Sequence, residues 1–294
     1  MIIVGCSNSV ELAKRIANKL KLPFSQLIVK HFPDGELYVR FGKPKELKNN
    51  VVTLIQTLHP NPSEALAELY FASKTAKELG VAKVIAIVPY LAYMRQDKAF
   101  RAGECISSRR MAEIINSCAD ELITIDPHLH RIKSLNEIFS IKTTKLTAIE
   151  PIANYIKKNF KNEIIVGPDI ESYQWAQTIA EKIKVEATIL RKRRWTATKV
   201  KIRMPPVLKK EIKNKNVIII DDVISSGATI LEAAKLLKPL KPKSITAIAT
   251  HGIFAAKALE KLKKEKINVI TTNTITNPVS RIDVSELIAK ALKL

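Results

Sequence analysis

Short runs of β-branched and aliphatic residues recur in the same order in the two halves of this 294-residue chain. The matching pairs are Ile2-Ile3-Val4-Gly5 with Ile164-Ile165-Val166-Gly167, residues 84–87 with 217–220, and residues 122–124 with 269–271. Three matches in one order indicate a tandem duplication, which predicts two related structural units. We therefore predict two domains, residues 1–146 and 147–294, that meet in the polar stretch around residues 143–150.

Each half alternates these runs with amphipathic stretches such as residues 63–79 and 229–237. This alternation is typical of βαβ units around a parallel sheet. The runs 84–88 and 218–220 are continuously apolar, which favours strands covered by helices on both faces. We predict an α/β fold of two tandem domains, each a mostly parallel sheet flanked by helices. Ligands of such sheets bind outside the carboxyl ends of the strands.

The formal net charge of +21 implies anionic partners, because net charge governs association rather than fold. Nucleic acid, an anionic membrane surface and phosphorylated metabolites all match that charge. No nucleic-acid-binding motif is visible, and aromatic residues make up only 5% of the chain, so we expect no nucleic-acid partner. The longest uncharged apolar run, residues 84–94, contains Pro89 and is too short to span a bilayer. We expect a cytoplasmic protein without a membrane partner.

The strongest chemical signal lies in residues 217–229. Four β-branched residues lead into Asp221-Asp222, and a loop of small and hydroxyl residues then opens a helix. Backbone N–H groups and hydroxyls at a helix N-terminus suit a phosphate dianion, whereas two carboxylates suit sugar hydroxyls, directly or through Mg²⁺. The alternative is that these residues only cap the helix.

Basic residues concentrate in residues 191–215, which contain 11 Lys or Arg and a single acid, Glu211. Within this segment Val200, Ile202 and Met204 alternate with basic residues, the period of a β-hairpin with one apolar and one cationic face. Residues 191–215 therefore supply nearly half of the net charge of +21. We interpret the segment as a lid that brings positive charge to phosphates. The alternative is a solvated basic edge that discourages strand pairing.

Seven short motifs occur in an order that resembles ribose-phosphate diphosphokinase, a family of tandem type I phosphoribosyltransferase folds. They are Phe32-Pro33-Asp34-Gly35-Glu36, residues 89–97, Asp126-Pro127-His128, Gly167-Pro168-Asp169, Lys192-Arg193-Arg194, residues 221–229 and Thr250-His251-Gly252. The resemblance covers essentially the whole chain. It implies transfer of the diphosphoryl group of ATP to the anomeric hydroxyl of ribose 5-phosphate, giving phosphoribosyl pyrophosphate (PRPP) and AMP, with Mg²⁺ as cofactor.

The resemblance also implies roles for individual residues. The catalytic residues are Lys192 and Arg194, and the metal-associated residues are His128 and Asp169. The ATP-binding residues are Phe32, Asp34, Gly35, Glu36, Arg95 and Gln96. The ribose 5-phosphate residues are Arg194, Asp221, Asp222, Ser225, Ser226, Gly227, Ala228 and Thr229. In the family the loop at residues 32–36 reaches the nucleotide across a subunit interface, so we expect a homo-oligomer.

The chain departs from the family pattern at two places. Pro127 replaces the usual Leu before His128, and His130 offers the metal a second candidate close by. The loop Ser225-Ser226-Gly227-Ala228-Thr229 lacks the acid that the family commonly carries there, but its hydroxyls and N–H donors remain. We also interpret Pro89-Tyr90 as the counterpart of Asp221-Asp222 in the first half of the chain. In this interpretation the end of that strand lost the sugar-phosphate site and came to bind ATP.

Two other functions compete with PRPP synthesis. A catalytically silent homologue would only bind nucleotides, and intact Lys192, Arg194, Asp221 and His128 argue against it. A salvage phosphoribosyltransferase would consume PRPP. The duplicated length of the chain and the Arg95-Gln96 pair argue against that reading.

Overall fold

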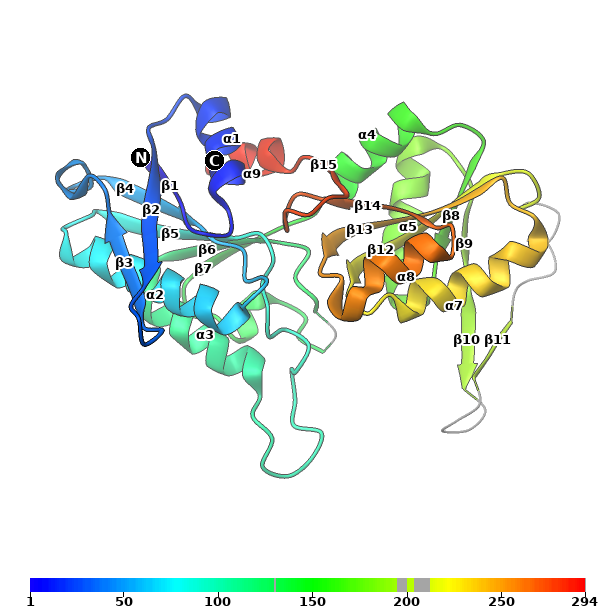
Figure 1. Ribbon diagram of the computed structural model, residues 1–294, viewed down its shortest axis with the longest axis horizontal. Helices are drawn as coiled ribbons and strands as arrows, with labels where there is room; N and C mark the ends of the chain where they lie inside the picture. Colours follow the sequence, from blue (N-terminus) through cyan, green and yellow to red (C-terminus); the bar gives the residue numbers. More distant parts are fainter. Residues whose placement is uncertain (130, 195–199, 204–211, 294) are drawn as a thin grey trace. The chain divides into compact units, whose positions relative to one another are not determined.

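The computed structural model describes residues 1–129, 131–194, 200–203 and 212–293, with the backbone alone for 170, 171, 191–194 and 200–203. The chain divides into two compact units (Figure 1). Unit 1 contains Met1–Thr147, Thr274–Thr276 and Val284–Leu294, and unit 2 contains Ala148–Asn273 and Asn277–Asp283. None of the described helices is long and apolar enough to cross a membrane.

Unit 1 is built on a seven-stranded sheet in the order β3-β2-β1-β4-β5-β6-β7. Neighbouring strands are parallel except for the antiparallel pair β2 and β3. The strands are β1 (Ile2–Gly5), β2 (Phe24–His31), β3 (Leu37–Phe41), β4 (Val51–Ile55), β5 (Lys83–Val88), β6 (Glu121–Ile125) and β7 (Lys142–Leu146). The helices are α1 (Val10–Leu20), α2 (Pro62–Glu78), α3 (Ser107–Cys118) and α9 (Ser285–Leu292), with short 3-10 turns η1 (Pro44–Glu46) and η2 (Leu135–Glu137).

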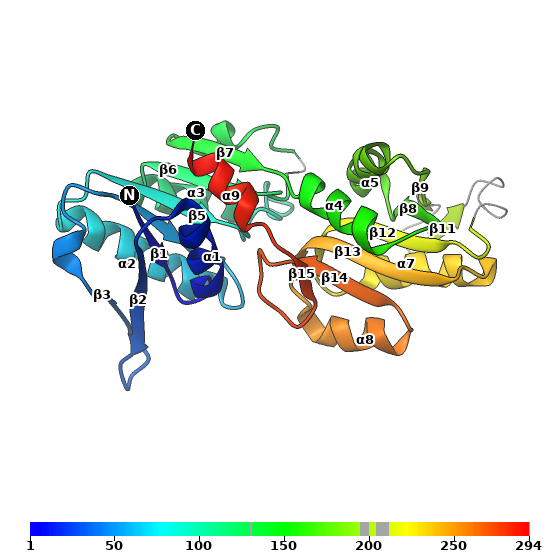
Figure 2. The ribbon, with the colours of Figure 1, turned by 90° about the horizontal axis from the view of Figure 1, so that it is seen from above.

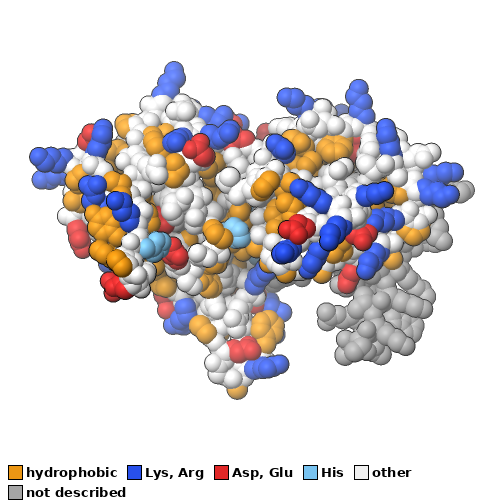
Figure 3. All heavy atoms as spheres, viewed as in Figure 1, with side chains coloured by type: hydrophobic (Ala, Val, Ile, Leu, Met, Phe, Trp, Pro, Cys, Tyr) orange, Lys and Arg blue, Asp and Glu red, His pale blue; other side chains and the backbone are white. Residues whose placement is uncertain are grey.

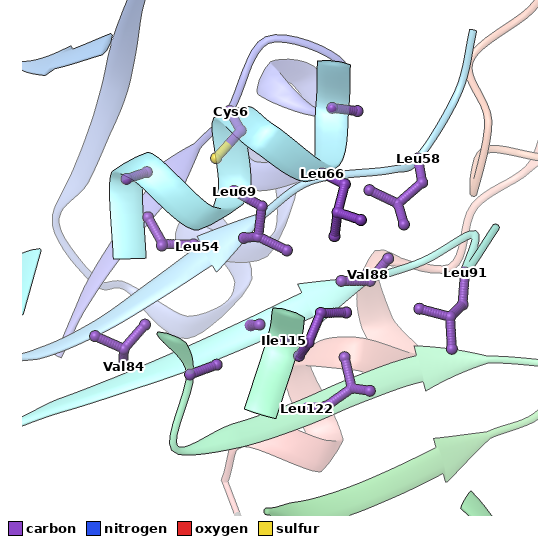
Figure 4. Packing of buried hydrophobic residues seen from close by; sticks show 14 of the residues in the cluster. Cys6, Leu54, Leu58, Leu66, Leu69, Val84, Val88, Leu91, Ile115 and Leu122 are labelled. Atoms are coloured by element: carbon purple, nitrogen blue, oxygen red, sulfur yellow. The ribbon is translucent and has the colours of Figure 1, made fainter. Parts of the chain in front are cut away.

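The sheet of unit 1 is covered on both faces. Val4, Leu54 and Val88 share one hydrophobic cluster with side chains of α2 and α3, such as Leu69 and Ile115 (Figure 4). The alternate strand residues are also buried, and α1 and α9 pack against each other. Continuous apolar strands are therefore buried by helices on both sides, as their sequences predict.

Unit 2 is built on a six-stranded, all-parallel sheet in the order β15-β14-β13-β12-β8-β9. The strands are β8 (Glu163–Gly167), β9 (Ala187–Ile189), β12 (Asn216–Ile224), β13 (Ser244–Gly252), β14 (Asn268–Thr272) and β15 (Ser280–Ile282). The helices are α4 (Ile149–Asn159), α5 (Ile170–Ile183), α7 (Ala228–Leu237) and α8 (Ala258–Lys264), with 3-10 turns η3 (Lys238–Leu240) and η4 (Ala255–Lys257). The prediction of mostly parallel sheets flanked by helices is confirmed.

The C-terminal end of the chain belongs to unit 1, although the sequence placed all of residues 147–294 in the second domain. Helix α9 lies beside α1 in both ribbon views (Figures 1 and 2). Its side chains Ile288 and Ala289 are buried, and Lys19 of α1 forms an ion pair with Glu286 at 3.2 Å. The return follows from the apolar face of a short terminal helix, which must be buried against another element.

The sheet order corrects one of the three matches between the halves. β1 and β8 hold equivalent positions in the two sheets. On one side each pairs with the strand that follows it in its sheet's chain order, β2 or β9, and on the other side it pairs with β4 or β12. Counting along each sheet from β1 and from β8, away from β2 and β9, β12 corresponds to β4 and β14 to β6. The match of residues 122–124 with 269–271 is therefore confirmed, and the match of 84–87 with 217–220 is wrong.

The register gives the true counterpart of the paired acids. Ile2 pairs with Val52 in unit 1 as Ile164 pairs with Val217 in unit 2. Extending both strands makes Gln56-Thr57 the counterpart of Asp221-Asp222, and the assignment of Pro89-Tyr90 was wrong. Short apolar runs resemble one another wherever they stand in a sheet, so letter matching alone misassigned this strand.

Candidate active site

The hairpin turn between β2 and β3 presents an aromatic ring and two carboxylates to solvent. The N–H of Phe32 donates to the carbonyl of Glu36, and the N–H of Gly35 donates back to the carbonyl of Phe32, both at 2.9 Å. Gly35 has φ of 94°, a conformation that glycine adopts without strain, and Asp34 Oδ1 accepts the N–H of Glu36 at 3.1 Å. The ring of Phe32 is 50% exposed and meets Tyr38 edge-on at 5.8 Å. The contact with Tyr38 thus holds the Phe32 ring in place, while half of the residue stays accessible to a ligand.

Arg95 and Gln96 lie in the long loop that joins β5 to α3. The hydroxyl of Ser107 donates to Gln96 Oε1 at 3.0 Å, and the N–H of Ser108 donates to the Gln96 carbonyl at 3.3 Å. Gln96 is therefore held against the first turn of α3. Arg95 precedes it with an exposed side chain.

His128 follows β6 at the carboxyl end of the unit 1 sheet and is half-buried. Asp126 before it is buried and has φ of 39°, so the chain turns sharply there. His130, the second candidate, lies outside the described residues. Across those residues, no three His, Cys, Asp or Glu side chains group as a metal site would require. His128 belongs to unit 1 and Asp169 to unit 2.

Asp169 sits where β8 passes into α5, because Gly167 lets the helix begin close to the strand. A Cβ atom at Gly167 would lie 2.7 Å from Cα of Tyr173, so only glycine fits there without displacing the helix. Asp169 is the N-cap of α5, and its Oδ1 accepts the N–H and the hydroxyl of Ser172 at 2.9 and 2.7 Å. The same hydroxyl lies 3.0 Å from Asp221 Oδ1. The structure thus brings together Asp169 and Asp221, which lie far apart in the sequence.

Three carboxylates gather at this edge of the unit 2 sheet. Burial raises the pKa of Asp221 well above its usual range, and the negative charges of Asp222 and Asp169 raise it further. Ser172 has a single hydroxyl hydrogen to share between Asp169 and Asp221. Carboxylate oxygens are ligands that Mg²⁺ takes in proteins, but these three carboxylates do not form a preformed group of metal ligands.

The loop after the paired acids leads directly into α7. Gly227 is the N-cap with φ of 74°, and Ser226 Oγ accepts the N–H of Ala228 at 3.5 Å. The first N–H groups of a helix have no partner within it and carry partial positive charge, which favours an anion there. Ser225 and Thr229, half-buried at either end of the loop, can add hydroxyl donors.

Lys192 and Arg194 lie on β10 (Arg191–Arg194), which pairs antiparallel with β11 (Val200–Arg203). The predicted hairpin is confirmed at the level of this pairing. The side chains of Lys192 and Arg194 lie outside the described residues, as does all of Met204. Their roles stay predictions.

Sequence reasoning missed Ser172 and Ser107. Ser172 stands three residues after the helix-capping Asp169, the spacing at which a cap and the first helical turn exchange hydrogen bonds. That spacing was visible in the sequence, but the contact of Ser172 with Asp221 depends on the parallel pairing of β8 with β12. Ser107 shows no comparable local signal.

Comparison with known proteins identifies the family. A family model described as the N-terminal domain of ribose phosphate pyrophosphokinase matches residues 1–118, and a phosphoribosyl transferase domain model matches residues 134–288. A ribose-phosphate pyrophosphokinase of Methanopyrus kandleri is 32% identical over 100% of this chain and 99% of its own length. The enzyme of that name from Methanobrevibacter smithii is 35% identical over 99% of this chain and 100% of its own length.

The crystal structure of phosphoribosylpyrophosphate synthetase from Mycobacterium smegmatis is also similar, with a TM-score of 0.83 over 99% of this chain and 97% of that one. At 24% identity this likeness concerns the fold, and it confirms the tandem arrangement expected from the repeat. The relatives match over almost their entire lengths, and the family models cover both halves of the sequence. The chain therefore belongs to the ribose-phosphate pyrophosphokinase family.

Proposed function

We propose that this protein transfers the β,γ-diphosphoryl group of ATP to the anomeric hydroxyl of ribose 5-phosphate, giving PRPP and AMP. The observation that carries the proposal is the group of Asp169, Ser172 and Asp221 beside the N-terminus of α7. Carboxylates for a sugar and its metal thus lie next to N–H groups for a phosphate, at the sheet edge where α/β proteins bind ligands.

Ribose 5-phosphate binds unit 2 in this proposal. The 5-phosphate lies against the loop Ser225–Thr229, where hydroxyls and the helix N-terminus donate hydrogen bonds. Asp221 and Asp222 accept hydrogen bonds from the ribose hydroxyls. The sugar is thereby oriented with its anomeric oxygen free to attack phosphorus, and such orientation lowers the entropic part of the barrier.

ATP is bound by residues of unit 1. The exposed ring of Phe32 offers a surface for the adenine base, while Asp34 and Glu36 supply acceptors for its amino group. Arg95 places positive charge near the phosphates, and Gln96 is held in place beside it. Because the hairpin turn points into solvent, we propose that it serves a neighbouring copy in a homo-oligomer. Both substrates are metabolites of the cytoplasm, where we place the protein.

Mg²⁺ is the proposed cofactor. Asp169 of unit 2 is a residue that would hold it, and His128 is proposed separately as a metal-associated residue of unit 1. The ion supplies charge neutralisation of the triphosphate and of the oxygen that leaves with AMP. In the transfer, the anomeric oxygen bonds to the β-phosphorus as the bond from that phosphorus to the α,β-bridging oxygen breaks, and the hydroxyl proton is released. Lys192 and Arg194 stabilise the developing charge on the bridging oxygen.

The test is a coupled assay for AMP. We expect AMP and PRPP in equal amounts from ATP, ribose 5-phosphate and Mg²⁺, and no AMP when either substrate or the metal is left out. Nucleotide binding without AMP release would indicate a silent homologue. Release of diphosphate from PRPP in response to an added base would indicate a salvage phosphoribosyltransferase instead.

Replacing Phe32 by Ala should raise KM for ATP by about tenfold or more, because stacking on an aromatic side chain contributes ~1–3 kcal/mol per base. The ring is half-exposed, so Tm should stay unchanged. Phe71, an exposed aromatic residue on α2, provides the control, since Phe71→Ala removes similar surface without touching the turn. An unchanged KM for ATP in Phe32→Ala would remove Phe32 from the nucleotide site.

A further inference from the structure

Two loops that carry proposed site residues begin side by side in unit 1. β5 and β6 are parallel neighbours, with Val88 paired to Thr124. The β5 loop carries Arg95 and Gln96, and the β6 loop carries His128. Both loops therefore leave the same edge of the sheet, where a direct link can hold one relative to the other.

Asp97 and Arg131 form that link. Nη1 of Arg131 donates to Asp97 Oδ1 at 2.8 Å, and the backbone N–H of Arg131 donates to Oδ2 at 3.2 Å. The Asp97 side chain is only 2% exposed, whereas that of Arg131 is 52% exposed. Burial alone would raise the pKa of Asp97, but the hydrogen bonds and charge of Arg131 outweigh it and lower this pKa. The buried carboxylate is thus ionised and engaged through both oxygens, the strong form of such a contact.

Arg131 and the residues next to Asp97 in the chain make further contacts. The guanidinium carbon of Arg131 lies 5.6 Å from the ring centre of Phe100, and Lys98 Nζ lies 5.2 Å from the same centre. Gln96, next to Asp97, is tied to Ser107 at the start of α3. The β5 loop extends from unit 1 in Figure 1, and these contacts fix its first part. A shift of the Arg131 backbone would therefore be transmitted to Gln96 through Asp97.

We propose that Arg131 is a positioning residue, which acts through Asp97 to hold the nucleotide residues Arg95 and Gln96 in register with the metal residue His128. This inference rests on the proposed function, which assigns ATP and Mg²⁺ to these loops. A site whose groups lie on two loops binds its ligand tightly only when both loops are held beforehand. Arg131 belongs to the part of the chain where the sequence departs from the family pattern.

Calorimetric titration with α,β-methylene-ATP and Mg²⁺ tests the proposal without turnover. We expect Arg131→Gln to raise the Kd of this complex about tenfold, since truncating one partner of a buried charge pair is costly. KM for ATP should rise in parallel while kcat stays within about threefold. Arg131→Lys, which keeps the charge, should restore most of the affinity. Arg110→Gln breaks an exposed ion pair with Glu113 on α3 and serves as the control.

A double-mutant cycle shows whether Asp97 and Arg131 affect nucleotide affinity through their shared contact or independently of each other. If Asp97 and Arg131 act through one contact, Asp97→Asn/Arg131→Gln should bind no more weakly than either single variant within about twofold. Additive losses, or a Kd within twofold of wild type in Arg131→Gln, would overturn the proposal, as would failure of the wild type to bind the nucleotide. Nucleotide binding without PRPP synthesis would overturn only the proposed function.

Discussion

Lys192→Ala should lower the rate of PRPP formation by ~10²–10³-fold, the usual cost of removing one group that stabilises transition-state charge. In the proposed mechanism the bridging oxygen of ATP gains negative charge as AMP leaves, and alanine cannot replace the ammonium group of Lys192 that would stabilise this charge. Lys192 lies on the short hairpin strand β10, outside the six-stranded sheet. We therefore expect Tm to change by no more than about 1 °C, because the substitution lies outside the two large sheets.

Single-turnover kinetics with saturating ATP and ribose 5-phosphate would check this result. Lys182→Ala is the matched control, since Lys182 is an exposed lysine on α5. The control should keep wild-type turnover. Undiminished turnover in Lys192→Ala would remove the lysine from the mechanism, whatever the activity of the control.

Asp221→Asn should have opposite effects on activity and on stability. We expect kcat/KM for ribose 5-phosphate to fall by ~10²-fold or more, because a neutral amide accepts sugar hydroxyls less strongly and donates where only an acceptor fits. Without Mg²⁺, the variant should unfold at a higher temperature than wild type. Burial and the charges of Asp222 and Asp169 destabilise the ionised Asp221, and the amide removes that repulsion.

The pH dependence of stability gives this prediction a definite sign. Folding raises the pKa of Asp221, so between its unfolded and folded values the folded state binds more protons. Its contribution to stability is therefore present below the unfolded pKa and is lost as pH rises through the folded pKa. Asp221→Asn should flatten this fall in denaturation scans run in EDTA. Glu260→Gln on α8 is the control, and an unchanged slope in Asp221→Asn would contradict the assigned charge cluster.

The two units differ, among the residues that the structure describes, at the position of the carboxylate site. In unit 1 the counterpart of Asp221 is Gln56, which is fully buried and whose Oε1 accepts the N–H of Asn8 at 3.2 Å. Glu64, the third residue of α2, places a negative charge where the third residue of α7 is the apolar Ile230. Unit 1 therefore has an amide in place of the Asp221 carboxylate, and it has a negative charge where a phosphate needs donors.

Much of this architecture could be predicted from local sequence. The helix predicted over 63–79 is α2, and the helix predicted over 229–237 is α7, because apolar periodicity is a local property. The return of α9 to unit 1 and the counterpart of Asp221 depend on which strands are neighbours, and short apolar runs do not encode that. The contacts of Ser172 and Arg131 likewise join segments that only the sheet brings together.

Surface charge was the weakest guide to function. Lys and Arg side chains are spread over the visible face of the described residues, with Asp and Glu among them (Figure 3). The +21 charge alone did not separate nucleic acid from phosphorylated metabolites. The ordered motifs did so, because each requires particular residue types at particular places along the chain.

The most direct test of the central claim follows two labels of ATP into products. Wild-type protein is incubated with ribose 5-phosphate, Mg²⁺ and ATP labelled at the α- or the γ-phosphorus. We predict that the γ label appears in PRPP and the α label in AMP, in equal amounts. Recovery of the γ label in inorganic phosphate or in a ribose bisphosphate, with the α label in ADP, would contradict diphosphoryl transfer.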